Sequence, residues 1–257
     1  MLAEVAGWTL TARAAWALAS ALGAWSCPAG DVSAGSSDEA AMETARHTMV
    51  REQIAARGVR DERVLAAMRA VPRHRFMPED VRQYAYDDGP LPIGYDQTIS
   101  QPFIVALMTE LARVGPDAKV LEVGTGSGYQ AAVLAKIVKE VYTIEIVGPL
   151  AERSRATLAE LGFTNVHVRH GDGYAGWPDE APFDAILVTA APPTIPEPLI
   201  RQLKQGGRMV VPVGEGVQDL RVVERSGDGV IQRSVIPVRF VPMTGAVRGD
   251  PPPAPPR

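Results

Sequence analysis

The sequence predicts an α/β protein with a doubly wound, mostly parallel sheet that ends in an antiparallel hairpin. From residue 119 onwards, short apolar runs rich in branched side chains alternate with segments of helical periodicity. This alternation is expected of a parallel sheet covered by helices on both faces. A glycine-rich turn follows the first apolar run, and the last two runs are separated only by Gly227, Asp228 and Gly229, which favours a hairpin.

The first part of the body is predicted to be helical. Residues 47–57 and 61–70 form two short helices separated by a glycine, and Asp61 is a plausible N-cap for the second. Residues 78–95 contain glycine and proline at several points and show no period, which is typical of a loop. Apolar side chains recur at helical spacing from residue 103, so a third helix is expected to begin near Ser100 and to end before residue 115.

The second part of the body supplies the predicted sheet. The expected parallel strands are residues 120–123, 141–146, 166–170, 183–189 and 207–213, and the expected helices between them are residues 129–139, 150–161 and 198–204. Residues 220–225 and 230–241 are expected to form the final hairpin.

Both ends of the chain differ from the body. Residues 1–41 are interpreted as an N-terminal extension that is signal-like or disordered, residues 42–245 as one domain, and residues 246–257 as a solvated proline-rich tail. Within residues 1–30, Arg13 precedes an uncharged apolar stretch and small residues, which is the layout of a secretory signal. The alternative is an upstream start codon, with translation from Met42 or Met49.

Composition excludes several classes of protein. The chain of 257 residues is 46% hydrophobic with a net charge of −4, so it is globular and has no broad basic face for nucleic acid. Its single cysteine excludes a disulfide framework and a cysteine-rich zinc site. Its four histidines lack metal-ligand spacing, so no metal is expected, and no apolar run reaches the roughly 20 residues of a membrane span.

The glycine turn is the most informative segment. Gly124, Gly126 and Gly128 form a G-x-G-x-G pattern between a strand and a helix, where glycines let a ligand approach the backbone. These glycines and Thr125 are the expected cofactor contacts, although glycines could also merely end the strand. The lysine of a phosphate-binding loop is absent, and the third glycine comes one residue too early for a dinucleotide fingerprint.

Acidic residues at successive strands favour a cationic nucleoside as the ligand. Glu122 stands two residues before the first glycine, where it would repel a pyrophosphate and attract a cation. Glu145 ends the next strand and can accept from ribose hydroxyls, and Asp172, followed by Gly173, could accept from an adenine amino group. Glu145 could instead be an exposed strand-end charge, and Asp172 a turn residue. S-adenosyl-L-methionine, which carries an ammonium and a sulfonium and no phosphate, is the expected cofactor.

From residue 49 to residue 245 the sequence resembles the protein-L-isoaspartate O-methyltransferases. The resemblance implies a class I methyltransferase fold, which is Rossmann-like. It also implies methyl transfer from S-adenosylmethionine to the free α-carboxylate of L-isoaspartyl residues in damaged proteins and peptides, which starts their repair through a succinimide. The alternative is another class I methyltransferase that acts on a small molecule. The matching stretches are residues 70–73, 91–94, 97–102, 120–130, 169–173, 183–193 and 238–242.

The resemblance places the family's active-site serine at Ser100. Its hydroxyl would donate to the substrate carboxylate and orient it, although a serine just before a helix is also a good N-cap. Thr98 and Ile99 are expected to shape the same mouth. Thr244 is a weaker candidate for substrate contact and could be an ordinary strand-end threonine.

The expected partners are age-damaged proteins and peptides that carry isoaspartyl residues. No nucleic acid is expected, nor a membrane partner for the core. We expect the protein in the cytoplasm, because S-adenosylmethionine is made there. The alternative is export to the periplasm through the signal-like segment.

Overall fold

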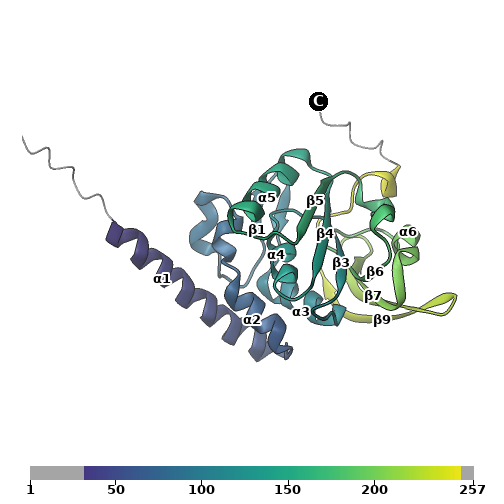
Figure 1. The fold of residues 1–257 in the computed structure, drawn as a ribbon, viewed down its shortest axis with the longest axis horizontal. Coiled ribbons are helices and arrows are strands. Elements are labelled where there is room, and N and C mark those ends of the chain that lie inside the picture. The colour runs from purple at the N-terminus through teal and green to yellow at the C-terminus, as the bar shows by residue number, and fades with distance from the viewer. Residues whose placement is uncertain (1–31, 250–257) are drawn as a thin grey trace, which may run out of the picture.

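The computed structural model describes residues 32–249, which are built around one seven-stranded sheet (Figure 1). The strand order is β5-β4-β3-β6-β7-β8-β9. The first five of these strands run parallel, and β8 and β9 add two antiparallel strands at one edge. The predicted fold class is therefore confirmed. The strands are β3 (Lys119–Val123), β4 (Glu140–Glu145), β5 (Val166–His170), β6 (Phe183–Val188), β7 (Leu203–Val213), β8 (Gln218–Ser226) and β9 (Gly229–Val238).

Alternating side chains of the strands build a core on each face of the sheet. Val120 of β3 packs into one core, and its neighbour Leu121 packs into the other, because successive side chains of a strand point to opposite faces. The first core lies beneath α2 (Glu62–Ala70), α3 (Pro102–Ala112), α4 (Tyr129–Ala135) and α5 (Gly148–Glu160). The second core is covered by α6 (Glu197–Arg201) and short 3₁₀ turns.

The order of the strands fixes where a ligand can bind. The chain proceeds from β3 to β4 and β5 on one side and later returns to β6 and β7 on the other. A crevice opens outside the carboxyl ends of the strands where the direction of winding reverses, here between β3 and β6. The glycine turn after β3 lies at this point.

The N-terminal helix begins earlier than the sequence predicted. Helix α1 (Val32–Met49) continues through a π-helical turn (Val50–Ile54) and a 3₁₀ turn (Ala55–Arg57), and ends at Gly58 with φ of 101°. The helix expected over residues 47–57 is therefore the end of a longer one, and the expected boundary at residue 41 falls inside α1. Residues 1–31 of the predicted extension and residues 250–257 of the predicted tail lie outside the described residues.

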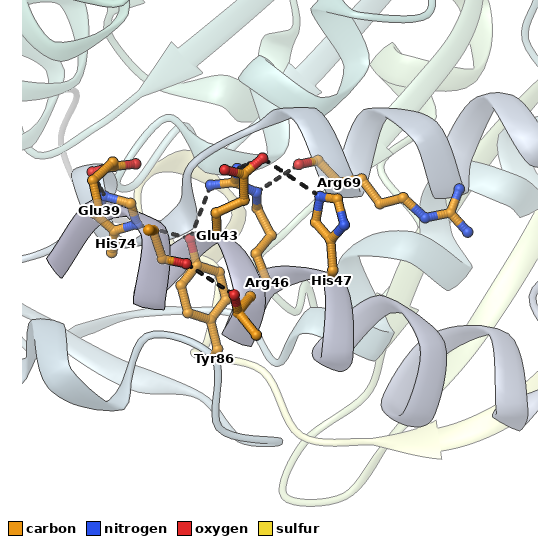
Figure 2. Close-up of polar contacts among 9 residues, drawn as sticks. Glu39, Glu43, Arg46, His47, Arg69, His74 and Tyr86 are labelled. Carbon is orange, nitrogen blue, oxygen red and sulfur yellow. Dashed lines mark hydrogen bonds and ion pairs between the residues drawn. The ribbon is translucent and has the colours of Figure 1, made fainter. Parts of the chain in front are cut away.

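Polar contacts, several of them buried, hold α1 against the rest of the domain (Figure 2). The buried Arg46 guanidinium donates through Nε to the carbonyl oxygen of Arg69 (2.5 Å) and through a second nitrogen to the hydroxyl of Tyr86 (3.4 Å). The same hydroxyl lies 2.8 Å from Nδ1 of His74, whose Nε2 lies 3.2 Å from Glu39 on α1. Burial lowers the pKa of His74 below its ordinary value. These contacts join three separate segments of the chain.

Several local elements differ from the sequence prediction. Within and just after the expected loop of residues 78–95, β1 (Leu91–Gly94) and β2 (Gln97–Ile99) pair as a small antiparallel hairpin. In its turn, Tyr95 and Asp96 adopt left-handed backbone conformations, at φ of 56° and 57°. The sequence Tyr-Asp is not one of the glycine-containing pairs that indicate such a turn. Helix α4 ends at Ala135, four residues before its predicted end at residue 139, and β7 begins at Leu203, inside the predicted helix 198–204.

No helix within residues 32–249 is long and apolar enough to cross a membrane.

Replacing Arg46 by alanine tests how α1 is fastened. We expect Arg46→Ala to lower the free energy of unfolding by about 2 kcal/mol, because it leaves a buried carbonyl and a buried hydroxyl without their charged donor. His47→Ala on the same helix is the control. The side chain of His47 is 52% exposed, and its replacement should change stability by less than about 0.5 kcal/mol. Urea unfolding measures both, and equal effects would show that the Arg46 contacts contribute nothing.

Candidate active site

Two adjoining hollows lie at the carboxyl edge of the sheet. The first, called the cofactor pocket from here on, is bounded by the glycine turn, the ends of β3, β4 and β6, β2 and residues 241–244. The second, called the groove, runs outward between α3 and the end of β9. The residues that line both are Thr98, Ser100, Thr189 and Val241.

The backbone of the glycine turn requires glycine at its first position. Gly124 has φ of 101°, and a Cβ there would lie 2.4 Å from Oγ1 of Thr189. That hydroxyl donates to the carbonyl oxygen of Gly124 at 2.6 Å and so fixes the turn against the end of β6. Three of the residues expected to contact the cofactor line the cofactor pocket, namely Gly124, Thr125 and Gly126. Gly128 does not line it, and instead begins α4 with φ of 89°.

Glu122 contributes a carboxyl group that is buried from solvent and lines the pocket. The residue is fully buried, and its Oε2 accepts a hydrogen bond of 2.6 Å from the hydroxyl of Thr143. The hydroxyl of Thr125 lies 2.6 Å from that of Thr143, so three side chains form a chain of hydrogen bonds. The other oxygen, Oε1, is buried with no partner among the described residues. A buried polar atom without a partner is costly, and here it belongs to a residue that lines a pocket.

Burial is the main cause of a raised pKa at Glu122. The pKa of this carboxyl is raised to about 8: desolvation raises it most, the hydrogen bond from Thr143 lowers it, and the nearby charge of Glu145 raises it. The carboxyl therefore holds its proton at neutral pH in the ligand-free protein. A cation placed against Oε1 would favour ionisation and supply the missing partner.

Glu145 lies at the end of β4 and is also nearly buried. Its Oε2 accepts from the backbone N–H of Gly126 (2.7 Å) and its Oε1 from that of Val147 (2.9 Å). Burial raises the pKa of Glu145, and these backbone donors lower it. Glu145 lines the pocket, and each of its oxygens has a second lone pair left, so the carboxylate can still accept hydrogen bonds from ribose hydroxyls.

Asp172 and Gly173 have different surroundings. Gly173 lines the pocket, where a Cβ would lie 2.4 Å from Cγ1 of Val123. The carboxylate of Asp172 accepts from the N–H of Tyr174 (2.8 Å) and of Ala246 (2.7 Å). Asp172 does not line the pocket, and these bonds agree with the alternative interpretation of a turn residue.

Thr98, Ile99 and Ser100 come to the mouth of the pocket on the β1–β2 hairpin and the link to α3. Ile99 is buried, whereas Thr98 is exposed and Ser100 partly so. The N-cap position of α3 is Gln101, and no side chain caps this helix. Capping therefore does not occupy the Ser100 hydroxyl, which lines both hollows at their junction.

The sequence alone did not identify Thr143, Thr189 or the course of residues 239–244. The backbone of Ala191 accepts from the N–H of Met243 and donates to the carbonyl of Val241, both at 2.8 Å, which carries Thr244 to the rim of the pocket. Thr143 lies in β4, the same strand as Glu145, and its role depends on its pairing with Glu122 of the neighbouring strand β3. Only the register of the sheet, which sequence does not reveal, brings these two side chains together.

The geometry suits a ligand with a cationic group at Glu122, hydroxyls at Glu145 and a reactive end near Ser100. Within residues 32–249, no three His, Cys, Asp or Glu side chains are grouped as a metal site.

Comparison with known sequences finds similarity to protein-L-isoaspartate O-methyltransferases. Residues 44–248 match the family model described as protein-L-isoaspartate(D-aspartate) O-methyltransferase (PCMT). A protein-L-isoaspartate O-methyltransferase of Gloeobacter violaceus is 61% identical over 198 residues, which are 76% of this chain and 97% of the relative. One from Opitutus terrae is 58% identical over 208 residues, which are 80% of this chain and 89% of the relative.

Solved structures agree with the sequence relatives. A protein-L-isoaspartate O-methyltransferase superposes with a TM-score of 0.73 at 28% identity, over 80% of this chain and 67% of that one. A Plasmodium falciparum structure described as a beta-aspartate methyltransferase (PCMT) in complex with S-adenosyl-L-homocysteine gives a TM-score of 0.67 at 26% identity, over 77% of this chain and 98% of that one.

The raised pKa of Glu122 makes a prediction about stability. Between pH 4.5 and pH 8, the folded protein retains a proton on Glu122 that the unfolded chain has released. The contribution of Glu122 to stability therefore decreases as the pH rises through this window. Glutamine cannot titrate at this position. We therefore expect the free energy of unfolding of Glu122→Gln, compared with that of the parent protein, to rise by about 3 kcal/mol between pH 5 and pH 8.

Urea unfolding of the ligand-free proteins at several pH values measures this difference. Glu152→Gln, which changes an exposed carboxyl on α5, is the control and should follow the parent curve. If the free energy of unfolding of Glu122→Gln changed with pH as it does in the parent protein, Glu122 would ionise normally in the folded protein.

Proposed function

The chain belongs to the protein-L-isoaspartate(D-aspartate) O-methyltransferase family, and we propose that it methylates isoaspartyl substrates at the junction of its two hollows. It is an S-adenosylmethionine-dependent enzyme that repairs isoaspartyl residues in proteins. The proposal concerns which residues of this chain hold each reactant. The observation that carries it is the position of the Ser100 hydroxyl, between a pocket lined by buried carboxyls and a groove open to the surface.

The cofactor pocket holds the donor through charge and shape. S-adenosylmethionine, when bound, supplies an activated methyl group on a sulfonium. The unpartnered Oε1 of Glu122 fits its ammonium, because a cation would satisfy the buried atom and ionise the carboxyl. Glu145 accepts from the ribose hydroxyls, and Gly124, Thr125, Gly126 and Gly173 let the ligand approach the backbone. Asp172 is kept as the adenine contact, because each of its oxygens accepts one backbone N–H and has a second lone pair left.

Ser100 orients the substrate carboxylate. An α-carboxylate has an ordinary pKa near 4 and is ionised at neutral pH, so the reaction needs no general base. The Ser100 hydroxyl donates to one carboxylate oxygen and leaves the other directed at the methyl group. Ile99 excludes water, and the exposed threonines Thr98 and Thr244 bound the mouth where the peptide enters. Rate acceleration comes mainly from positioning and from exclusion of water.

We also propose that the enzyme acts in the cytoplasm, where its cofactor is made. Sequencing the N-terminus of the mature protein tests this. Cleavage within residues 1–30 would contradict it and support export.

Methylation of matched peptides tests the reaction. With S-adenosylmethionine labelled in its methyl group, we expect label to enter a peptide that contains L-isoaspartate and not the same peptide with normal aspartate. The difference arises because only the isoaspartyl residue presents an α-carboxylate as a side branch of the chain. Equal labelling of the two peptides, or labelling of small molecules alone, would contradict the proposal.

Ser100→Ala separates orientation from cofactor binding. We expect kcat for the isoaspartyl peptide to fall by roughly tenfold to a hundredfold, as for the loss of one hydrogen bond to a charged group. The Kd for S-adenosylmethionine, measured by calorimetry, should change less than about twofold, because the proposal gives the Ser100 hydroxyl a contact with the acceptor and none with the cofactor. Ser226→Ala, at the exposed end of β8, is the control. An unchanged kcat in Ser100→Ala would remove this serine from the active site.

A further inference from the structure

The groove beside the cofactor pocket is apolar and positively charged. Its lining residues, all within residues 32–249, include two arginines, Arg57 and Arg239, and no acidic residue. Apolar side chains such as Phe103, Ile104 and Phe240 form most of the remaining wall. A peptide that enters here to reach Ser100 therefore passes cations and no lining anions.

The charge of Arg57 is already matched within the protein. Its guanidinium lies 3.0 Å from Oδ2 of Asp88 and stacks over the ring of Phe103 at 3.7 Å from the centroid. Asp88 also accepts from Nε2 of Gln101 (2.7 Å), so Arg57 belongs to a small cluster that holds the start of α3. This arginine is structural and attracts an acidic ligand weakly.

Arg239 differs from Arg57 because its charge has no counterpart. Its side chain is exposed and makes no hydrogen bond or ion pair with any residue of the described range 32–249. It lines the groove, as Ser100 also does. A cation without an internal partner beside an anion-binding site raises the local concentration of acidic ligands.

The backbone that carries Arg239 is held in place. The side chain of Gln218 is buried and clamps the next residue, Phe240, accepting from its N–H (2.8 Å) and donating to its carbonyl (3.3 Å). In β9, Ile236 pairs with Leu220 and Ser234 with Arg221, which leaves Val235 as a bulge. Bulges redirect a strand and are common beside active sites. Arg239 is therefore presented to the groove from a fixed position.

We propose that Arg239 makes the enzyme prefer isoaspartyl substrates that carry an acidic side chain close to the damaged residue. This inference rests on the function proposed above. The carboxylate of the flanking residue pairs with the Arg239 guanidinium while the isoaspartyl carboxylate lies at Ser100. A lysine at the same place in the substrate is repelled. The preference acts on binding, so it changes KM more than kcat.

The experiment uses isoaspartyl hexapeptides that differ at one position. Glutamate, glutamine or lysine is placed in turn at each of the two residues before and the two residues after the isoaspartate. At one or more of these positions we expect kcat/KM to be about fivefold higher for glutamate than for lysine at low salt, with the difference shrinking in salt.

Four variants assign the preference to one side chain. Arg239→Gln should abolish it, Arg239→Glu should invert it and Arg239→Lys should keep most of it. Arg233→Gln, which removes an exposed arginine of β9 that does not line the groove, is the matched control and should leave the preference intact.

The possible failures are distinguishable. If the parent enzyme methylates no isoaspartyl peptide, or methylates the aspartyl twins equally, the proposed function fails and this inference fails with it. If the parent enzyme methylates the isoaspartyl peptides but uses all flanking residues equally, the inference alone is overturned. A preference for acidic flanking residues that persists in Arg239→Glu also overturns the inference, because a residue other than Arg239 must then recognise the flanking charge.

Discussion

The buried carboxyl of Glu122 is the constraint on which the site depends. A carboxyl at this depth is costly whether it holds its proton or not, because one oxygen has no partner. The fold satisfies the other oxygen through Thr143, and the sheet holds that pair in register. In the proposed function, a cation from the ligand supplies the missing partner. Binding energy would then be concentrated on the charged end of the cofactor, where it would also distinguish a sulfonium nucleoside from a phosphorylated one.

Segments far apart in the sequence meet where the two hollows join. Ser100 comes from the link between β2 and α3, Thr189 from the end of β6, and Val241 from the chain after β9. Thr189 is fixed by its hydrogen bond to Gly124, and Val241 by a backbone hydrogen bond to Ala191. These two positions are therefore held in place beside Ser100, which suits a reaction whose rate depends on orientation.

The sequence predicted those features that follow from local patterns. The alternation of apolar runs and the glycines of residues 124–128 were enough for the sheet, the turn and the acids at the strand ends. What escaped prediction depends on contacts across the fold. The hairpin of β1 and β2 turns through Tyr95 and Asp96, which adopt a backbone conformation typical of glycine or asparagine. Asp172 matches the expected pattern, yet its oxygens bond to backbone amides, one of them at Ala246, which lies far along the chain.

The two hollows differ in the ionisable groups that line them, and this difference bears on how the proposed reaction releases its products. Carboxyls line the cofactor side, at Glu122 and Glu145, and the arginines line the substrate side. In the proposed function, a cationic donor binds on the first side, an anionic acceptor binds on the second, and the two meet at Ser100. Transfer of the methyl group from sulfur to oxygen turns the sulfonium into a neutral thioether and the carboxylate into a neutral ester. The charges of the two reacting atoms vanish together, whereas the ammonium that Glu122 would hold keeps its charge. The transfer therefore weakens the hold on the products at the methyl-transfer end of the site and leaves the contact at Glu122 unchanged.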